Sequence, residues 1–314
     1  MRKLFTTLAV LSLASSLFAQ KIVFTPQWTA QTQFSGYYVA YEKGFYSDEG
    51  LDVEIRHLSA NSSETAIYEL MKGNADIVGA QLLSSMISRS DGMRLVNVLQ
   101  LTQKSGLCCV SHNPISSPEE LNSLKVGRWR AGFADFCDLL ENFSGIHINW
   151  IPFLNTVNLY VYNAVDATLA FSYSELIALE LAIGKIPDDH IIRFADFGYK
   201  FPEDGLYVTE EYYRKNKDLV DKFVQASKRG WDYTRTHREE ALDITWEYIR
   251  KHNITTNREL QKRMLDEYLD LQVNPGTGIT DYAPVRPEVF AKIVEALINV
   301  GLIVNNIKYE DMIR

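Results

Sequence analysis

The chain has 314 residues, and 46% of them are hydrophobic, which is enough for one large domain or two ordinary ones. Its net charge is −8, and an acidic chain lacks the clustered Lys and Arg that a phosphate backbone requires. We therefore expect no nucleic-acid partner, whereas the charge says little about small molecules.

Residues 1–19 have the layout of a secretory signal peptide. Arg2 and Lys3 precede an apolar run from Leu4 to Leu17, and Ala19 ends a cleavage site of the usual kind. The run is shorter than the about 20 residues that a membrane span needs, and no cysteine near the cleavage point offers a lipid attachment site. Loss of Arg2 and Lys3 changes the net charge from −8 to −10. We expect a periplasmic protein without a lipid anchor and without a later membrane span.

From residue 21 to about residue 197, short β-rich runs alternate with helical patterns. In the first set, Gly44 ends a helix over 34–43, and Gly73 ends a helix that begins at a capping box formed by Asn61 and Glu64. The predicted strands of this set are 22–24, 53–56, 75–80 and 95–101, and a further helix lies near 82–87.

A second set begins at residue 107, where Ser117 and Glu120 form another capping box around Pro118. Its predicted strands are 107–110, 125–127, 148–152, 167–171 and 191–194, and its helices are 133–143 and 175–183. From Glu210 onward the pattern is nearly all helical, over 218–236, 239–252, 258–269 and 287–300. Strands that alternate with helices predict parallel sheets with helices on both faces, and two such sets predict two lobes.

Ligands bind to open parallel sheets just past the carboxyl ends of the strands. The segment after the first strand, residues 25–33, is rich in amides and hydroxyl groups, contains Trp28 and is uncharged. An aromatic platform with a few hydrogen-bonding groups suits a planar, polar ring compound. The alternative is that Trp28 is a core residue and the glutamines form a solvated turn. The location after a strand favours the first interpretation.

Residues 27–46, QWTAQTQFSGYYVAYEKGFY, and then EGLDV at 49–53, resemble the opening signature of one substrate-binding family. That family contains the binding components of ABC importers for sulfonates, nitrate and thiamine-pyrimidine precursors, and the related pyrimidine synthase of the thiamine pathway. Further segments are similar to it in the expected order: GNADI at 73–77, VDAT at 165–168, YSE at 173–175, FPEDG at 201–205 and FVQASKRGW at 223–231.

The resemblance implies an α/β protein with the two-lobed type II periplasmic binding protein fold. Each lobe would be a mostly parallel sheet flanked by helices, with the ligand cleft between the lobes. Residues 20–103 and 201–314 would form the first lobe and residues 104–200 the second. Hinge closure would allow a membrane ABC permease to recognise the ligand-bound form. We therefore expect a monomeric solute-binding component without cofactor or metal, and a thiamine pyrimidine precursor is the favoured ligand.

The candidate ligand residues lie after the strands or stand at positions of the family's motifs. Trp28 stands at the family's ring-stacking position, whereas Gln27 and Gln33 depart from the residues of the thiamine-precursor members. The loop from Gly127 to Gly132 is a candidate anion site through its backbone N–H groups, which Arg128 and Arg130 would reinforce unless they are solvated. The full set is Gln27, Trp28, Gln31, Gln33, Tyr37, Gln81, Gly127, Trp129, Gly132, Tyr173, Glu175 and Asp204. Glu203 is balanced between an exposed turn residue and a partner for a ligand amino group, and Asp204 is favoured over it.

Enzyme functions have little support in the sequence. The six histidines are scattered, and Cys108-Cys109 lacks the spacing of zinc sites. The alternatives are a pyrimidine synthase, whose cysteine-rich run is missing here, and a ligand-sensing subunit for a membrane signalling kinase. We expect Cys108, Cys109 and Cys137 to be buried free thiols, while a pairing of Cys137 with one of the other two stays open.

Overall fold

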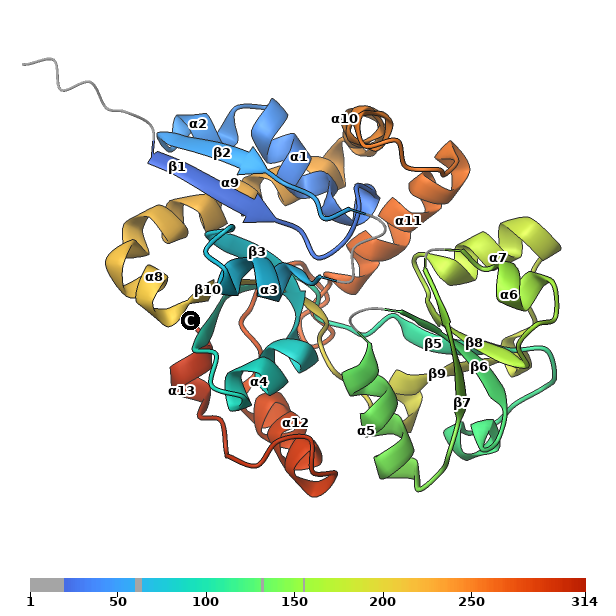
Figure 1. The fold of residues 1–314 in the computed structure, drawn as a ribbon. Helices are drawn as coiled ribbons and strands as arrows, with labels where there is room; N and C mark the ends of the chain where they lie inside the picture. The colour runs from blue at the N-terminus through green and yellow to red at the C-terminus, as the bar shows by residue number, and fades with distance from the viewer. Residues whose placement is uncertain (1–19, 60–63, 131–132, 155) are drawn as a thin grey trace, which may run out of the picture.

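The computed structural model describes residues 20–59, 64–130, 133–154 and 156–314. The predicted signal peptide, Asn61 of the predicted capping box and Gly132 lie outside these residues. The described residues form two lobes, each built on a five-stranded sheet with helices packed against it (Figure 1). No helix in these ranges is both long and apolar enough to cross a bilayer.

The sheet of the first lobe has the strand order β2-β1-β3-β10-β4. Its strands are β1 (Gln20–Thr25), β2 (Leu51–Ile55), β3 (Ile77–Gln81), β4 (Leu95–Gln100) and β10 (Asp204–Thr209). The early helices of this lobe are α1 (Ser35–Glu42), α2 (Phe45–Asp48), α3 (Ala66–Met71) and α4 (Leu82–Ser90), with a 3-10 turn η1 (Thr32–Phe34) before α1. The C-terminal helices are α8 (Glu210–Lys215), α9 (Lys217–Thr236), α10 (Arg238–Lys251), α11 (Arg258–Leu271), α12 (Pro287–Asn299) and α13 (Tyr309–Met312).

The sheet of the second lobe has the matching order β7-β6-β8-β5-β9. Its strands are β5 (Leu107–Ser111), β6 (Lys125–Trp129), β7 (Asn149–Phe153), β8 (Ala167–Phe171) and β9 (Ile191–Arg193). The helices are α5 (Ala134–Ser144), α6 (Asn158–Val161) and α7 (Glu175–Ile183), with 3-10 turns η2 (Pro118–Leu121), η3 (Asp188–His190) and η4 (Phe194–Phe197).

Each sheet is mixed, because one strand runs against the others. β10 pairs antiparallel with β3 and β4, and β5 pairs antiparallel with β8 and β9. The mostly parallel arrangement predicted from the strand–helix alternation is therefore confirmed, but β10 was not predicted. Each antiparallel strand comes directly after a crossing between the lobes, so the chain enters both sheets in the reverse direction. The boundaries at residues 103 and 200 stay a prediction.

The structure differs from the expected helix starts at two places. Helix α3 begins after Thr65, whose hydroxyl accepts a hydrogen bond from the N–H of Tyr68, while Glu64 forms an ion pair with Lys72. Near Pro118 the chain makes only a 3-10 turn, and Glu120 accepts hydrogen bonds from the N–H and hydroxyl of Ser116. The predicted stop at Gly44 is confirmed, because this residue adopts a left-handed φ of 77°.

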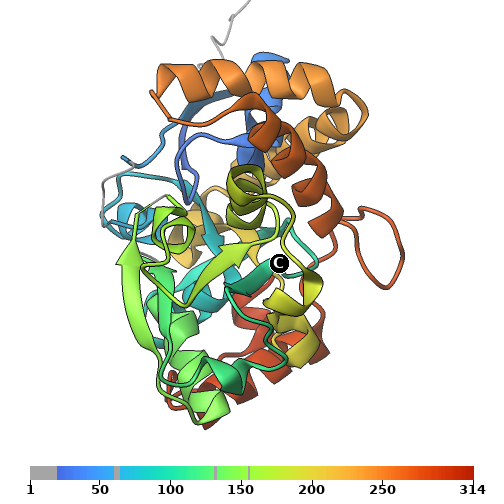
Figure 2. The ribbon, with the colours of Figure 1, turned by 90° about the vertical axis from the view of Figure 1, so that its right-hand side faces the viewer.

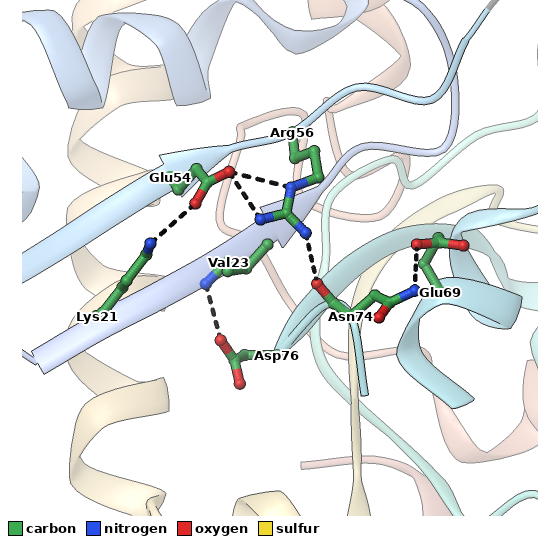
Figure 3. A network of polar contacts seen from close by, with 7 residues as sticks. All are labelled: Lys21, Val23, Glu54, Arg56, Glu69, Asn74 and Asp76. Atoms are coloured by element: carbon green, nitrogen blue, oxygen red, sulfur yellow. Dashed lines mark hydrogen bonds and ion pairs between the residues drawn. The ribbon is translucent and has the colours of Figure 1, made fainter. Parts of the chain in front are cut away.

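In each lobe, one aspartate exchanges hydrogen bonds with the backbone of a strand residue in the same way. The N–H of Val23 in β1 donates to the Asp76 carboxylate at 2.8 Å, and the Asp76 N–H donates back to the Val23 carbonyl at 2.9 Å. The second lobe repeats this exchange between Lys125 and Asp166. Figure 3 shows Asp76 beside β1, next to a chain of contacts in which Glu54 links Lys21 to Arg56. The two Asp residues of the GNAD and VDA segments thus have structural roles.

Candidate ligand cleft

A cavity of about 220 Å³ lies between the lobes, where the strands of both sheets end. Its first-lobe residues lie at or after the ends of β1, β2 and β3, and its second-lobe residues lie at or after the ends of β6 and β8. This is the position that the topology of open α/β sheets dictates, since loops and helix starts converge at the carboxyl ends of the strands. The lining residues from the two lobes include Gln27, Trp28, Gln31, Gln33, Gln81, Ser84, Trp129, Phe133, Asp135, Phe171, Tyr173 and Glu175.

Trp28 is the aromatic residue of the first-lobe wall, where it lines the cavity and is partly buried against the core. Its carbonyl oxygen lies 2.7 Å from Nδ1 of His57, and Nε2 of the same ring lies 2.7 Å from the hydroxyl of Tyr38. Burial lowers the pKa of His57 to about 4, so the ring is neutral. Nδ1 must therefore carry the proton that is donated to Trp28, and Nε2 accepts from Tyr38. These contacts fix the backbone of Trp28 at the edge of the cavity.

The second-lobe wall is a cluster of aromatic rings. The Trp129 ring lies 4.3 Å from that of Phe133 and 5.1 Å from that of Phe171, and Phe171 stacks on Tyr173 at 4.9 Å. Glu175 holds this wall in place, because its two carboxylate oxygens accept from Nε1 of Trp129 and from the N–H of Phe171, each at 3.0 Å. Burial raises the pKa of Glu175, and these two hydrogen bonds act against that rise.

Polar contacts join the lobes beside the cavity. The Gln33 amide donates to the Tyr173 hydroxyl at 3.2 Å and to the Asp204 carboxylate at 2.6 Å, and Tyr268 also donates to Asp204 at 2.7 Å. Gln31 donates to the oxygen of the Gln33 amide at 2.5 Å. This hydrogen-bond network connects the first-lobe wall, the second lobe and the segment where the chain crosses between them.

The crossing segments are themselves bonded to one another. Glu203 accepts hydrogen bonds from the Ser105 hydroxyl at 2.7 Å and from the N–H of Gly106 at 2.9 Å, while Thr102 accepts from the N–H groups of Glu203 and Asp204. Burial raises the pKa of Glu203 to about 8, against the hydrogen bond from Ser105, and burial also raises the pKa of Asp204. The exposed-turn interpretation of Glu203 is therefore wrong, since the side chain is buried in the hinge.

A second link lies outside the cavity. Arg263 of α11 forms an ion pair with Glu180 of α7, so a first-lobe helix contacts a second-lobe helix directly. Figures 1 and 2 show α11 extending from the first lobe to the side of α7. On the other side, α5 of the second lobe packs beside α4. The two lobes therefore contact each other outside the cavity through α11 and α7 and through α4 and α5.

The charges at the cavity have one sign. The lining side chains include the carboxyl groups of Glu64, Asp135 and Glu175, and none of the described lining residues is Lys, Arg or His. Arg128 precedes Trp129 in β6 and Arg130 is exposed; neither lines the cavity. In the described ranges, no cluster of His, Cys, Asp and Glu is arranged to hold a metal ion.

The family profile described as NMT1/THI5 like matches residues 31–241, which is more than half of the chain. The chain belongs to the NMT1/THI5-like family. Of curated relatives, the riboflavin-binding protein RibY of Chloroflexus aurantiacus is 24% identical over 276 residues, covering 83% of this chain and 77% of that protein. The 4-amino-5-hydroxymethyl-2-methylpyrimidine phosphate synthase of Candida albicans is 23% identical over 236 residues, covering 70% of this chain and 69% of that protein.

Solved structures show the same fold. The periplasmic aliphatic sulphonate binding protein SsuA of Escherichia coli superposes with a TM-score of 0.64 at 14% identity, over 92% of this chain and 95% of that one. The predicted resemblance and the two-lobed periplasmic binding fold are thereby confirmed for this NMT1/THI5-like chain. Because the identity is low, the likeness to SsuA concerns the fold alone.

The structure brings eight of the predicted ligand residues to the cavity of this NMT1/THI5-like chain. They are Gln27, Trp28, Gln31, Gln33, Gln81, Trp129, Tyr173 and Glu175. Their roles in ligand binding stay a prediction. Two of them also make contacts within the protein: Glu175 accepts a hydrogen bond from Trp129, and Gln33 donates one to Tyr173 of the other lobe.

Three predicted residues do not line the cavity. Tyr37 is a core residue, since α1 turns its ring toward Phe24 at 4.7 Å and Trp231 at 5.6 Å. Gly127 lies inside β6, where a Cβ would meet the Thr168 hydroxyl at 2.7 Å, so its role is close strand packing. Asp204 does not line the cavity, but its carboxylate accepts a hydrogen bond from the lining residue Gln33.

Sequence reasoning missed Phe133, Phe171, Asp135 and Ser84 as lining residues. Phe171 is the last residue of a predicted strand, and Asp135 and Phe133 stand at the start of a predicted helix. A position at or soon after the end of a strand is the signal that indicated Trp28, and it could have found these residues in the second lobe. The three cysteines are buried and free as predicted, and burial raises the pKa of Cys108 to about 12.

Proposed function

We propose that this chain is the periplasmic solute-binding component of an ABC importer and that it captures a flat nitrogen heterocycle between its lobes. The observation that carries the proposal is a cavity whose two walls are aromatic, Trp28 on one lobe and the Trp129 cluster on the other. Aromatic rings on the two walls of a narrow cavity bind planar ligands by stacking, and the amides of Gln27, Gln31 and Gln81 offer hydrogen bonds at the rim of such a ring.

The charge of the lining supports this ligand class over the small anions. Sulfonate, nitrate and phosphate groups are bound by Arg, Lys or backbone N–H groups at helix starts. The described lining has no basic side chain and includes three carboxyl groups, so no side chain there offers a positive charge to an anion. The anion site predicted near Gly127 is accordingly not part of the proposal.

The finer proposal is a thiamine pyrimidine precursor. A volume of about 220 Å³ lies below the roughly 300–1,000 Å³ of typical ligand pockets, which favours a ligand of one ring with short substituents. Riboflavin is the second candidate, because RibY is a relative over 83% of this chain and is named for binding it. A three-ring flavin would need the lobes to open further than they do here.

A binding role suits the chemistry of the side chains better than catalysis does. Glu175 is committed to Trp129 and Phe171, and the three thiols are buried away from the cavity. The relatives named as synthases make a pyrimidine synthase the enzyme alternative. The proposed partner is a membrane permease that recognises the closed form of a monomer. The alternative partner is a membrane signalling kinase that recognises the same closed form.

Thermal unfolding of the purified chain with a ligand panel tests the proposal. The panel holds 4-amino-5-hydroxymethyl-2-methylpyrimidine, riboflavin, an alkanesulfonate and nitrate. A ligand at 100 times its Kd adds about 2.7 kcal/mol of stability, so the bound heterocycle is expected to raise Tm by several degrees. Stabilisation by the sulfonate or nitrate, without any by the heterocycles, would contradict the ligand class. Formation of a pyrimidine product on incubation with the purified chain would instead support the synthase.

A further inference from the structure

We infer that Asp135 selects the ligand by charge, accepting a hydrogen bond from a protonated or amino nitrogen of the bound ring. The cleft then takes amine-bearing or amidine-bearing heterocycles and rejects their phosphorylated or sulfonated forms. The inference rests on the proposed function, because it concerns the same cavity, and it adds the chemical class that the cavity distinguishes.

Three carboxyl groups of the described residues line the cavity. Glu64 forms an ion pair with Lys72 at 3.0 Å. Glu175 has both carboxylate oxygens engaged by Trp129 and Phe171. Asp135 has no ion pair with any described residue. Among the described lining residues, Asp135 is thus the carboxylate with neither an ion pair nor an N–H donor that a hydrogen-bond or ion-pair contact records.

The surroundings of Asp135 make that charge costly in the empty cavity. The residue is half-buried in the first turn of α5, and its polar neighbour is the hydroxyl of Ser84, which belongs to α4 of the first lobe. Burial raises the pKa of Asp135, and the like charges of Asp138 and Asp91 raise it further. A cationic or strongly donating nitrogen would compensate this desolvated carboxylate, whereas a neutral acceptor or an anion would not.

A carboxylate in the first turn of a helix also stabilises that helix through its dipole. The two roles make different predictions, because a helix-stabilising aspartate affects all ligands equally and lowers Tm when it is replaced. A charge-selecting aspartate changes the preference between two ligands of the same shape. Asp189, an exposed aspartate of the second lobe that does not line the cavity, provides a control.

The test measures Kd by calorimetry for 4-amino-5-hydroxymethyl-2-methylpyrimidine and for its 4-oxo counterpart, which has the same outline and no amino group. We expect the unmodified chain to prefer the amino compound by roughly 10- to 100-fold, the range for a charge-assisted hydrogen bond. Asp135→Asn should reduce that preference to within about threefold. Asp189→Asn should leave it unchanged, and Asp135→Glu, which keeps the charge, should retain part of it. The phosphate ester of the amino compound should bind at least about tenfold more weakly than the free compound.

The outcomes separate this inference from the proposed function. Equal affinity for the amino and oxo compounds, or tighter binding of the phosphate ester, overturns the inference and leaves the solute-binding function standing. Binding of riboflavin alone, which carries no basic amino group, has the same consequence. An equal loss of both ligands in Asp135→Asn and in Asp135→Glu would show a structural role and overturn it too. Failure of every heterocycle to bind contradicts the proposed function itself.

Discussion

The side-chain amide of Gln33 in the first lobe donates a hydrogen bond to the hydroxyl of Tyr173 in the second lobe at 3.2 Å. Both residues line the cavity, so this link connects the lobes beside the space for the ligand. The same amide donates to Asp204 at the crossing between the lobes. A ligand that contacts Gln33 or Tyr173 therefore lies beside a hydrogen bond that joins the two lobes.

Replacement of Tyr173 by Phe should weaken ligand binding about 2- to 10-fold, because it removes one buried hydrogen bond between neutral groups. The ring that stacks on Phe171 at 4.9 Å and meets Tyr268 at 5.2 Å is kept. Stopped-flow fluorescence should show the change mainly as faster dissociation, since the closed form is less stable. Tyr162→Phe, at a tyrosine that is 77% exposed, is the control. An unchanged dissociation rate in Tyr173→Phe would mean that the interlobe bond does not hold the closed form.

Trp28→Ala should weaken binding roughly 10- to 100-fold, because it removes the stacking platform of the first-lobe wall. The far-UV circular dichroism spectrum should stay the same, since the residue lines the cavity. Trp246→Ala removes a half-buried tryptophan of α10 that does not line the cavity and should leave Kd unchanged. Loss of the folded spectrum in Trp28→Ala would instead make Trp28 a core residue.

Glu203→Gln should make stability less dependent on pH. Burial raises the pKa of Glu203 to about 8 in the folded chain, whereas an unfolded glutamate titrates near about 4.3. Between these values the folded state holds more protons than the unfolded one, so stability falls as pH rises through this window and stays lower above pH 8. The amide keeps the acceptor for Ser105 and Gly106 and replaces the oxygen that has no described partner.

Urea unfolding at about pH 5 and about pH 8 measures this effect. The stability of Glu203→Gln relative to the unmodified chain should increase by a few kcal/mol over that range, up to roughly 5 kcal/mol from the pKa difference. The difference between the two proteins cancels the contribution of His57, whose lowered pKa acts in the opposite direction below pH 6.5. Glu295→Gln, at an exposed glutamate of α12, should show no such trend. Parallel pH profiles for Glu203→Gln and the unmodified chain would contradict the assignment.

Asp76→Ala should destabilise the first lobe by about 1–3 kcal/mol, because the N–H of Val23 loses a charged acceptor. Asp166→Ala should do the same in the second lobe, where the N–H of Lys125 loses its acceptor. Asp52→Ala, at an exposed position of β2, should change stability by less than about 0.5 kcal/mol. Chemical denaturation of the three variants checks this. Stability equal to that of Asp52→Ala in both other variants would show that the paired hydrogen bonds contribute nothing.

Much of the first-lobe wall could be predicted from the sequence. Trp28, Gln31 and Gln33 were predicted because they lie after a strand that its own composition identifies, and chain connectivity alone places them at the sheet's carboxyl edge. Tyr37 was predicted from the same segment and lies in the core instead. The cause is α9, which approaches so closely that a Cβ on Gly36 would lie 2.2 Å from the Trp231 ring. These two residues are far apart in the chain, and no local pattern records their contact.

The sequence by itself determined the order of strands and helices, because alternating and helical periodicity is recorded in neighbouring residues. Only the tertiary structure decided the insertion of β10, whose six residues begin with Asp204 and Gly205 and are ordered by pairing with β3 and β4. It also decided which charges remain unbalanced in the cavity. Glu64 of the first lobe and Asp135 and Glu175 of the second lobe line the same cavity. Lys72 forms an ion pair with Glu64, and Trp129 donates a hydrogen bond to Glu175. This combination of carboxyl groups arises only when distant segments of the chain come together.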